Sequence, residues 1–212
     1  MEININLGSG PQYVDGWINY DKSPNILLSK FSKLKRMLFS LNLLNDSQAL
    51  YWDPRVKYAD IRKIKFPDNS VDNFYLSHVL EHVYFDEAAQ ILRKCFLSLK
   101  RGGVLRICSP DYEKYILKYI QESKINELEA SSNFNDSLLS YPKNRPSLVA
   151  SLISKRSGHI HYWHPFKSQL VHLLFDSGFS KVEIRTFRKG VIPSINEIET
   201  RSEFSFYLEA FK

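Results

Sequence analysis

The sequence predicts an α/β protein built on an open sheet, with strands and helices alternating along one domain. Strand-like and helix-like segments follow one another throughout the 212 residues. The composition, 43% hydrophobic and 25% charged, is that of a folded globule. No unit of roughly 20–50 residues repeats, so solenoids and propellers are excluded along with disordered and fibrous proteins.

The strands are predicted from short apolar or alternating segments bounded by turn residues. Residues 3–7 alternate Ile-Asn-Ile-Asn-Leu and meet the turn Gly8-Ser9-Gly10-Pro11. The clearest strand follows Gly102-Gly103 and stops at Pro110. The full set of predicted strands is 3–7, 17–20, 56–59, 74–77, 104–108, 181–188 and 203–211.

Two helices have clear signals. Residues 86–100 carry a regular apolar face and open on Asp86, a favourable N-cap. Residues 167–177 are followed by Gly178, which suits the position just beyond a helix. The polar stretch 123–157 contains two prolines, and we interpret it as a variable, partly helical insertion in a single domain spanning residues 1–212.

Composition narrows the class of protein further. Subtracting 23 acidic from 29 basic residues leaves a net charge of +6, too weak to demand a nucleic-acid partner. Cys95 and Cys108 cannot build a disulfide scaffold or a four-ligand zinc site. No apolar run reaches the roughly 18 residues of a membrane span, and no leader precedes the first strand. We therefore expect a soluble, cytoplasmic domain.

Glycine or polar residues stand at the end of each of the first five predicted strands. In an open α/β sheet, ligands bind beyond the carboxyl ends of the strands, so these residues form the predicted site. In chain order they are Gly8, Ser9 and Gly10, then Asp21, Asp60, Ser77, His78, Ser109, Pro110 and Asp111.

The turn after the first strand favours a nucleoside over a dinucleotide. The dinucleotide fingerprint requires a third glycine and the start of a helix, whereas Pro11-Gln12-Tyr13 follows here. An acid at Asp21 can accept both hydroxyls of a ribose, and an acid at Asp60 can accept from an exocyclic amine. A plain turn and solvated loop carboxylates are the alternatives for each feature taken singly.

These residues carry a resemblance to a known family. The segments are Ile5-Asn6-Leu7-Gly8-Ser9-Gly10-Pro11, Gly16-Trp17-Ile18-Asn19-Tyr20-Asp21, Asp60-Ile61-Arg62, Phe66-Pro67-Asp68-Asn69-Ser70-Val71-Asp72, Ser77-His78-Val79-Leu80-Glu81-His82-Val83 and Leu99-Lys100-Arg101-Gly102-Gly103-Val104-Leu105-Arg106. In this order they resemble the type-11 S-adenosylmethionine-dependent methyltransferases, in a short form often met in cell-surface polysaccharide gene clusters. The resemblance covers residues 1–111, with weaker echoes at 158–163 and 205–210.

The resemblance implies S-adenosylmethionine as cofactor and a Rossmann-like fold. That fold is a seven-stranded, mostly parallel sheet with an antiparallel last strand and helices on both faces. The implied cofactor residues are Gly8, Ser9 and Gly10 near the methionyl part, Asp21 at the ribose, Asp60 at the adenine amino group, and Ile61 and Ser77 beside them. Residues 11–16 are too few for the usual helix between the first two strands, so we expect Tyr13 or Trp17 to supply that wall.

Three residues are candidates for catalysis. His78 follows the fourth strand, and a histidine with the ordinary pKa of about 6.5 suits a general base; the alternative is that it caps the next turn. His161 lies in an aromatic segment that we interpret as an acceptor wall, with packing against the sheet as the alternative. Asp111 is the nearest acid to replace an acceptor contact that related chains carry after the tryptophan.

His78, Glu81 and His82 are spaced to share one face of a helical turn. Such a face can hold a divalent metal. A hydrogen-bonded hinge between strand and helix is the interpretation we favour, and no metal site is predicted.

Residues 26–44 are basic and amphipathic. They are predicted to form a crossover helix from the second strand to the third, with contact to the inner face of a membrane as the alternative. We expect methyl transfer to a small-molecule or glycan acceptor, at oxygen, without a nucleic-acid partner. The alternatives are an RNA methyltransferase and a non-catalytic cofactor-binding module that partners a glycosyltransferase.

Overall fold

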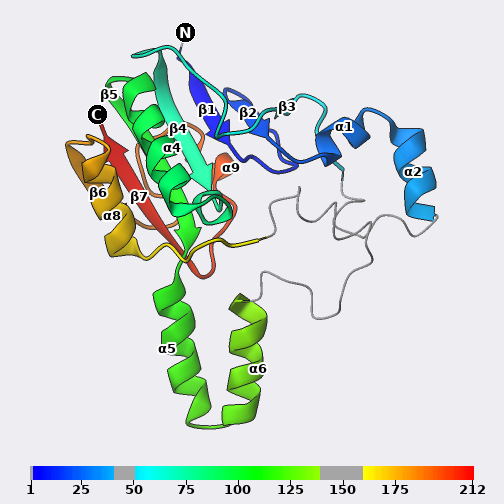
Figure 1. Cartoon of the computed structure of the whole chain (residues 1–212), viewed down its shortest axis with the longest axis vertical. Helices are drawn as coiled ribbons and strands as arrows, with labels where there is room; N and C mark the ends of the chain where they lie inside the picture. The colour runs from blue at the N-terminus through cyan, green and yellow to red at the C-terminus, as the bar shows by residue number, and fades with distance from the viewer. Residues whose placement is uncertain (1, 41–50, 139–159) are drawn as a thin grey trace.

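The computed structural model describes residues 2–40, 51–138 and 160–212. Its centre is a seven-stranded sheet with the order β3, β2, β1, β4, β5, β7, β6 (Figure 1). The strands are β1 (Asn4–Leu7), β2 (Ile18–Asp21), β3 (Lys57–Tyr58), β4 (Val71–Ser77), β5 (Leu99–Pro110), β6 (Lys181–Arg185) and β7 (Ser205–Phe211). Each segment predicted as a strand is one, with ends shifted by a few residues.

The sheet is parallel except at β7. Strand β1 pairs in parallel with β2 on one side and β4 on the other, and β4 pairs in parallel with β5. Strand β7 is antiparallel to both β5 and β6, which confirms the predicted antiparallel last strand. The order of the strands reverses between β1 and β4, the place where open α/β sheets bind ligands.

The described helices are α1 (Asn25–Ser29), α2 (Ser32–Ser40), η1 (Leu80–His82), α4 (Phe85–Ser98), α5 (Tyr112–Ser123), α6 (Glu127–Leu138), α8 (Lys167–Asp176) and α9 (Ile195–Ile198). The predicted N-cap at Asp86 is wrong: α4 begins at Phe85, and Glu87 accepts the N–H of Tyr84 at 3.0 Å. Helix α8 ends as predicted, with Gly178 at a φ of 106°. In the described ranges no helix is long and apolar enough to cross a bilayer.

The predicted single helix over 26–44 is two helices instead. Helix α1 ends at Ser29, whose hydroxyl turns back to donate to the carbonyl of Ile26 at 2.8 Å, and α2 begins at Ser32. Such bonds from serine to the backbone compete with continuation of a helix. Residues 41–44 lie outside the described ranges.

Within the predicted insertion at 123–157, helix α6 packs beside α5 in a hairpin that extends from the sheet (Figure 1). Residues 139–157 lie outside the described ranges.

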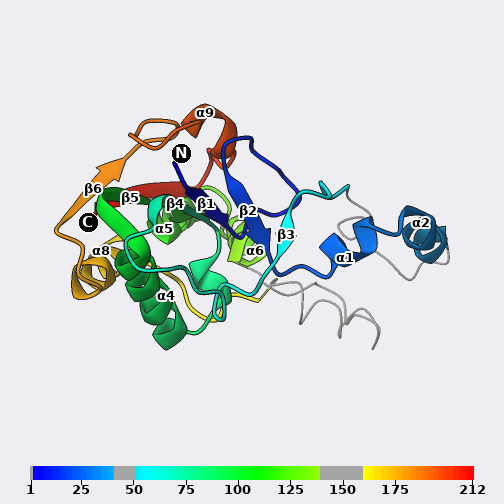
Figure 2. The same ribbon diagram turned by 90° about the horizontal axis from the view of Figure 1, so that it is seen from above.

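The two faces of the sheet are covered differently. Helices α4 and α8 pack on one face against the alternate apolar residues of β1, β4, β5 and β7. The other face carries α9 and the segments around it, on the opposite side from α4 and α8 in Figure 2. There Trp17 packs edge-to-face on Tyr75 with ring centroids 6.3 Å apart, beside Ile192 and Ile198. Trp17 and the chain before α9 thus cover the face on which the helix expected between the first two strands is missing.

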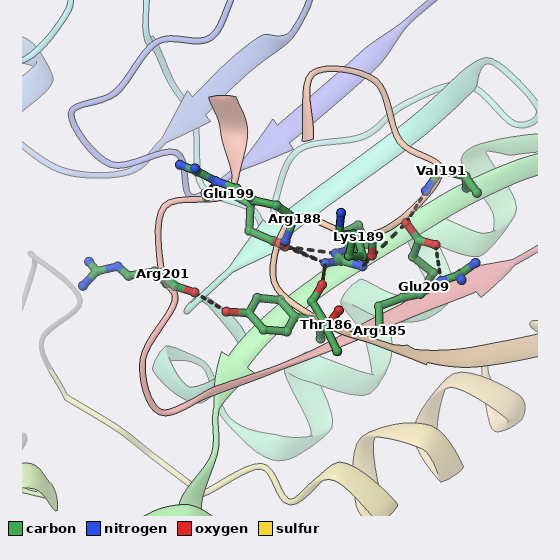
Figure 3. A network of polar contacts seen from close by, with 10 residues as sticks. Arg185, Thr186, Arg188, Lys189, Val191, Glu199, Arg201 and Glu209 are labelled. Carbon is green, nitrogen blue, oxygen red and sulfur yellow. Dashed lines mark hydrogen bonds and ion pairs between the residues drawn. The ribbon is translucent and has the colours of Figure 1, made fainter. Parts of the chain in front are cut away.

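A buried ion-pair network holds residues 186–199 on this face (Figure 3). The Arg106 guanidinium, fully buried in β5, donates to both carboxylate oxygens of Glu199 at 2.9 Å. It also donates to the carbonyls of Thr186 and Lys189 at 3.1 and 3.0 Å. Its Nη1 lies 3.7 Å from Glu209 of β7. One arginine therefore fastens the segment to the sheet.

Candidate functional site

A cavity of about 730 Å³ lies at the carboxyl ends of β1, β2 and β4. This volume is within the roughly 300–1,000 Å³ of small-molecule sites. Its walls include the predicted residues Gly8, Ser9, Gly10, Asp21, Ile61, Ser77, His78 and His161. Asp60 and Asp111 are not among the residues that line it. Most of the predicted strand-end residues therefore meet at one place, where the strand order reverses.

The glycine turn after β1 is held to the end of β2. The N–H groups of Gly8 and Ser9 donate to the carbonyl of Tyr20 at 2.8 and 3.0 Å. The N–H of Gly10 donates to the Asp21 carboxylate at 2.9 Å. These three N–H groups already have acceptors within the protein, whereas phosphate-binding loops turn theirs toward the ligand. The turn is thus built for a ligand that brings no pyrophosphate to it.

The carboxylate of Asp21 faces the cavity from the last residue of β2. One oxygen accepts from Gly10 and the other from the N–H of Ser23 at 2.7 Å. Burial raises the pKa of this carboxyl, while the bonds from Ser23 and Gly10 act in the opposite direction. A carboxylate can accept about four hydrogen bonds. Capacity for about two hydroxyl donors is left, as a ribose diol requires.

Asp60 follows the carboxyl end of β3, but its carboxylate already accepts hydrogen bonds from Arg62. The guanidinium of Arg62 lies 2.6 Å from one oxygen, and the backbone N–H of Arg62 donates to the other at 3.0 Å. The side-chain bond from Arg62 holds the pKa of Asp60 below its usual value. The neighbours Ala59 and Ile61 line the cavity. The residues after β3 therefore contribute mainly apolar side chains to the cavity wall.

Gly8 is required by both backbone and packing. Its φ is +76°, and a Cβ there would lie 2.3 Å from Cγ2 of Val79. We expect Gly8→Ala to lower the free energy of unfolding by about 2–3 kcal/mol, from left-handed strain plus the clash. Gly10, with φ +64° and no atom within 4 Å of a Cβ, is the matched control. Urea unfolding should show Gly10→Ala losing only about 1 kcal/mol, and equal losses would contradict the clash.

His78 lines the cavity, but its ring nitrogens face protein groups. The Ser205 hydroxyl donates to the carbonyl of Glu203, so it accepts from Nε2 of His78 at 3.0 Å. The Nδ1 atom then carries the lone pair and lies 3.4 Å from Glu81. Burial and then the charge of Arg201 lower the pKa of His78 to about 4. These contacts hold the ring in place more than they prepare it as a base.

The backbone also separates His78 from the helical turn that the sequence spacing indicates. Its φ is 52°, in the left-handed region that non-glycine residues rarely adopt. The 3-10 helix η1 starts only at Leu80. The predicted helical face shared by His78, Glu81 and His82 is therefore not formed.

Asp111 has a structural task. It is the N-cap of α5, and its carboxylate accepts the backbone N–H of Lys114 at 3.3 Å. Its side chain is 6% exposed and also pairs with the Lys114 ammonium at 3.5 Å. The structure does not bring it to the cavity wall.

His161 is also part of the cavity wall. Its Nδ1 lies 3.0 Å from the hydroxyl of Tyr112, and its ring centroid is 4.8 Å from that of His82. Burial lowers the pKa of His161, and the neighbouring His164 adds to this. His82 and His161 both line the cavity. The aromatic segment predicted as an acceptor wall therefore does reach the site.

Other residues reach the cavity from loops without periodic sequence signals. Trp52 precedes β3, Ile64 follows Asp60, and Arg201 lies between α9 and β7. The chain before Arg201 is fixed by Glu199, and the hydroxyl of Tyr207 donates to the Arg201 carbonyl. In Figure 3 the Arg201 side chain points away from the buried network. A basic residue near the start of the last strand could have been noted in the sequence, but nothing there placed it in the cavity.

Part of the chain is similar to a known protein family. Residues 25–107 match the family model of the methyltransferase domain. This segment is less than half of the chain, and it is similar to the methyltransferase domain of that family. The cofactor of the chain is S-adenosylmethionine, and the cavity fits an adenosyl group through the acceptor positions of Asp21 and its apolar edge. The family match begins after Asp21 and therefore does not include the glycine turn. The role of this turn is inferred from its hydrogen bonds alone.

Solved S-adenosylmethionine-dependent methyltransferases share the fold of this chain. One from Archaeoglobus fulgidus gives a TM-score of 0.53 at 16% identity, covering 100% of this chain and 86% of that one. One from Mesorhizobium loti gives 0.52 at 15%, covering 99% and 90%. A third, from Methanosarcina mazei, gives 0.51 at 14%, covering 100% and 92%. No curated protein sequence matches.

Proposed function

We propose that this enzyme transfers the methyl group of S-adenosylmethionine to an oxygen of a small-molecule or glycan acceptor. The observation that carries the proposal is that one cavity is lined both by Asp21 and Gly10 and by His82 and His161. Donor and acceptor can therefore meet inside one enclosure.

The donor side follows from the residues at the strand ends. Asp21 accepts from the ribose hydroxyls, and Ile61 and Ile64 form the apolar wall for the adenine. Asp60 serves the adenine amino group only in competition with Arg62. Gly8, Ser9, Gly10 and Ser77 lie beside the methionyl part. When bound, the cofactor supplies an electrophilic methyl group on its sulfonium.

The acceptor side is the wall of His82 and His161. Methyl transfer is an in-line displacement, and positioning alone can lower such barriers by roughly 7–11 kcal/mol. His161, oriented by Tyr112, faces the acceptor. His78, which donates to Ser205 and lies beside Glu81, acts as a positioning residue for this wall.

Purified enzyme incubated with methyl-labelled cofactor and a panel of glycans, phenols and RNA tests this function. We expect S-adenosylhomocysteine to form at least about tenfold faster with a hydroxyl acceptor than without one. Label transfer to RNA alone, falling steeply as salt rises, would instead support an RNA methyltransferase. Cofactor binding without turnover on any acceptor would support a non-catalytic module.

Helices α1 and α2 support contact with a membrane surface. The apolar side chains of Leu27 in α1, Phe39 in α2 and Phe31 between the two helices are exposed. Lys33 and Arg36 lie on α2 and are exposed as well. Exposed apolar side chains with basic neighbours bind anionic lipid.

We expect the chain to co-sediment with anionic phosphatidylglycerol vesicles and not with neutral phosphatidylcholine vesicles. Phe31→Ser should weaken this binding. Phe175→Ser on α8, an exposed aromatic in a different helix, should not. Equal loss from both variants would refute the contact.

A further inference from the structure

Glu81, His82 and His161 bring three metal-ligating groups together. One ligand atom from each lies within 4.8 Å of the other two. Glu81 and His82 belong to η1, whereas His161 comes from the segment before α8. The cluster depends on tertiary structure, and so it differs from the helical face that the sequence spacing suggests.

Three hydrogen bonds fix the two segments against each other. The N–H of Tyr162 donates to the carbonyl of Glu81 at 2.8 Å, and the Trp163 indole donates to the carbonyl of Leu80 at 2.7 Å. The Nδ1 of His82 lies 3.0 Å from the carbonyl of Ile160 and must donate to it. The lone pair of His82 is therefore on Nε2. A ring N–H donated to a backbone carbonyl is the usual arrangement of a metal-ligating histidine.

Glu81 is the independent observation that points to a ligand. Its side chain is 0% exposed, and neither carboxylate oxygen accepts a hydrogen bond from the described residues. Nδ1 of His78 lies 3.4 Å from Glu81, but by the direction of the Ser205 bond this atom carries no proton, so it neither donates to the carboxylate nor forms an ion pair with it. A buried carboxyl group without hydrogen bonds either gives up its charge or keeps it by pairing with a cation or binding a metal.

We propose that Glu81, His82 and His161 bind a divalent transition-metal ion, with zinc as the probe. Two imidazoles and one carboxylate are a ligand set of catalytic zinc sites, which keep a further position open. Ligand distances of about 2.0–2.2 Å set neighbouring ligand atoms roughly 3.4 Å apart. The present spacing, up to 4.8 Å, means that the ligand side chains must move inward when the ion binds.

The location of the cluster gives the metal a role. Because His82 and His161 line the cavity, the open coordination position faces the acceptor. A metal there orients an acceptor hydroxyl and lowers its pKa, which favours the attacking alkoxide. This role rests on the proposed function, whereas metal binding itself does not.

Calorimetry with Zn²⁺ on the chelator-treated, untagged chain tests the site. We expect one strong site per chain, and weaker binding of Mg²⁺ because imidazole suits zinc better. Glu81→Gln and His161→Ala should each weaken zinc binding by more than roughly 10–100-fold. That is the loss expected when only a residue hydrogen-bonded to a metal ligand is removed. His172→Ala, which removes an exposed histidine on α8, should leave it unchanged.

The outcomes separate binding from catalysis. If Glu81→Gln does not fold, His161→Ala at the cavity wall still decides the result. Zinc binding that is absent, or equally strong in wild type, Glu81→Gln and His161→Ala, would overturn the proposal even if methyl transfer is observed. Loss of zinc binding in the two variants, with unchanged binding of S-adenosylhomocysteine, would support it whether or not an acceptor is found.

Discussion

Replacing Arg106 by methionine is expected to lower the free energy of unfolding by about 3–5 kcal/mol, the usual cost of removing one partner from a buried ion pair. Arg106 and Glu199 are both fully buried and joined by hydrogen bonds of 2.9–3.0 Å. Methionine fills similar volume, so the loss comes mainly from the carboxylate left behind. Urea unfolding at neutral pH measures it.

Two controls identify the cause of this loss. Burial raises the pKa of Glu199, so the destabilisation by Arg106→Met should shrink as pH falls through that pKa and the carboxyl becomes neutral. Adding Glu199→Leu should restore part of the stability, because the buried charge is removed as well. A loss below about 1 kcal/mol, or a double variant no better than the single one, would contradict the assignment.

The same network connects stability to the site. Glu199 immediately precedes Thr200 and Arg201, both of which line the cavity. Arg106 anchors Glu199 from β5, near the middle of the sheet. The wall that carries Arg201 is therefore positioned by a polar core rather than by the helix that usually separates the first two strands.

Local sequence patterns predicted the sheet because apolar alternation and turn residues mark strands, even in β1, where Asn4 and Asn6 are buried as well as the apolar residues. The alternation in residues 3–7 and the glycine and proline around β5 mark strands whatever lies beside them. The same reasoning could not interpret Arg106, which stands within the most evident strand. Its partner Glu199 is 93 residues away along the chain, and no local pattern records such a pair.

The site was predictable where it depends on strand ends. Gly8, Gly10 and Asp21 meet in the cavity because parallel strands share one carboxyl edge. The side-chain partners were not predictable in this way. Arg62 donates to the carboxylate of Asp60, and nothing local in the sequence indicated this pair. Asp111 is the N-cap of α5. This role could have been noted, because aspartate is a favoured residue directly before a helix. Sequence position located these acids without showing what engages them.

Asp21→Ala is expected to weaken binding of S-adenosylhomocysteine by about 100-fold, measured by calorimetry. Hydrogen bonds to a charged group contribute about 1.5 kcal/mol or more each, and two ribose hydroxyls would lose their acceptor. The variant also frees the N–H groups of Gly10 and Ser23, which Asp21 holds at 2.9 and 2.7 Å. Asp21→Asn keeps one acceptor oxygen for this turn and should show an intermediate loss.

The matched control for this substitution is Asp72→Ala. Asp72 lies near the amino end of β4, whereas the cavity lies at the carboxyl end of this strand. Its carboxylate pairs with Lys100 at 2.7 Å. It removes one carboxylate from the same sheet without touching the site, so cofactor affinity should stay unchanged. If Asp21→Ala remains folded and binds S-adenosylhomocysteine as tightly as Asp72→Ala does, the ribose does not lie on Asp21. The adenosyl group would then have to enter the cavity in another orientation, and the geometry of the glycine turn would need a different explanation.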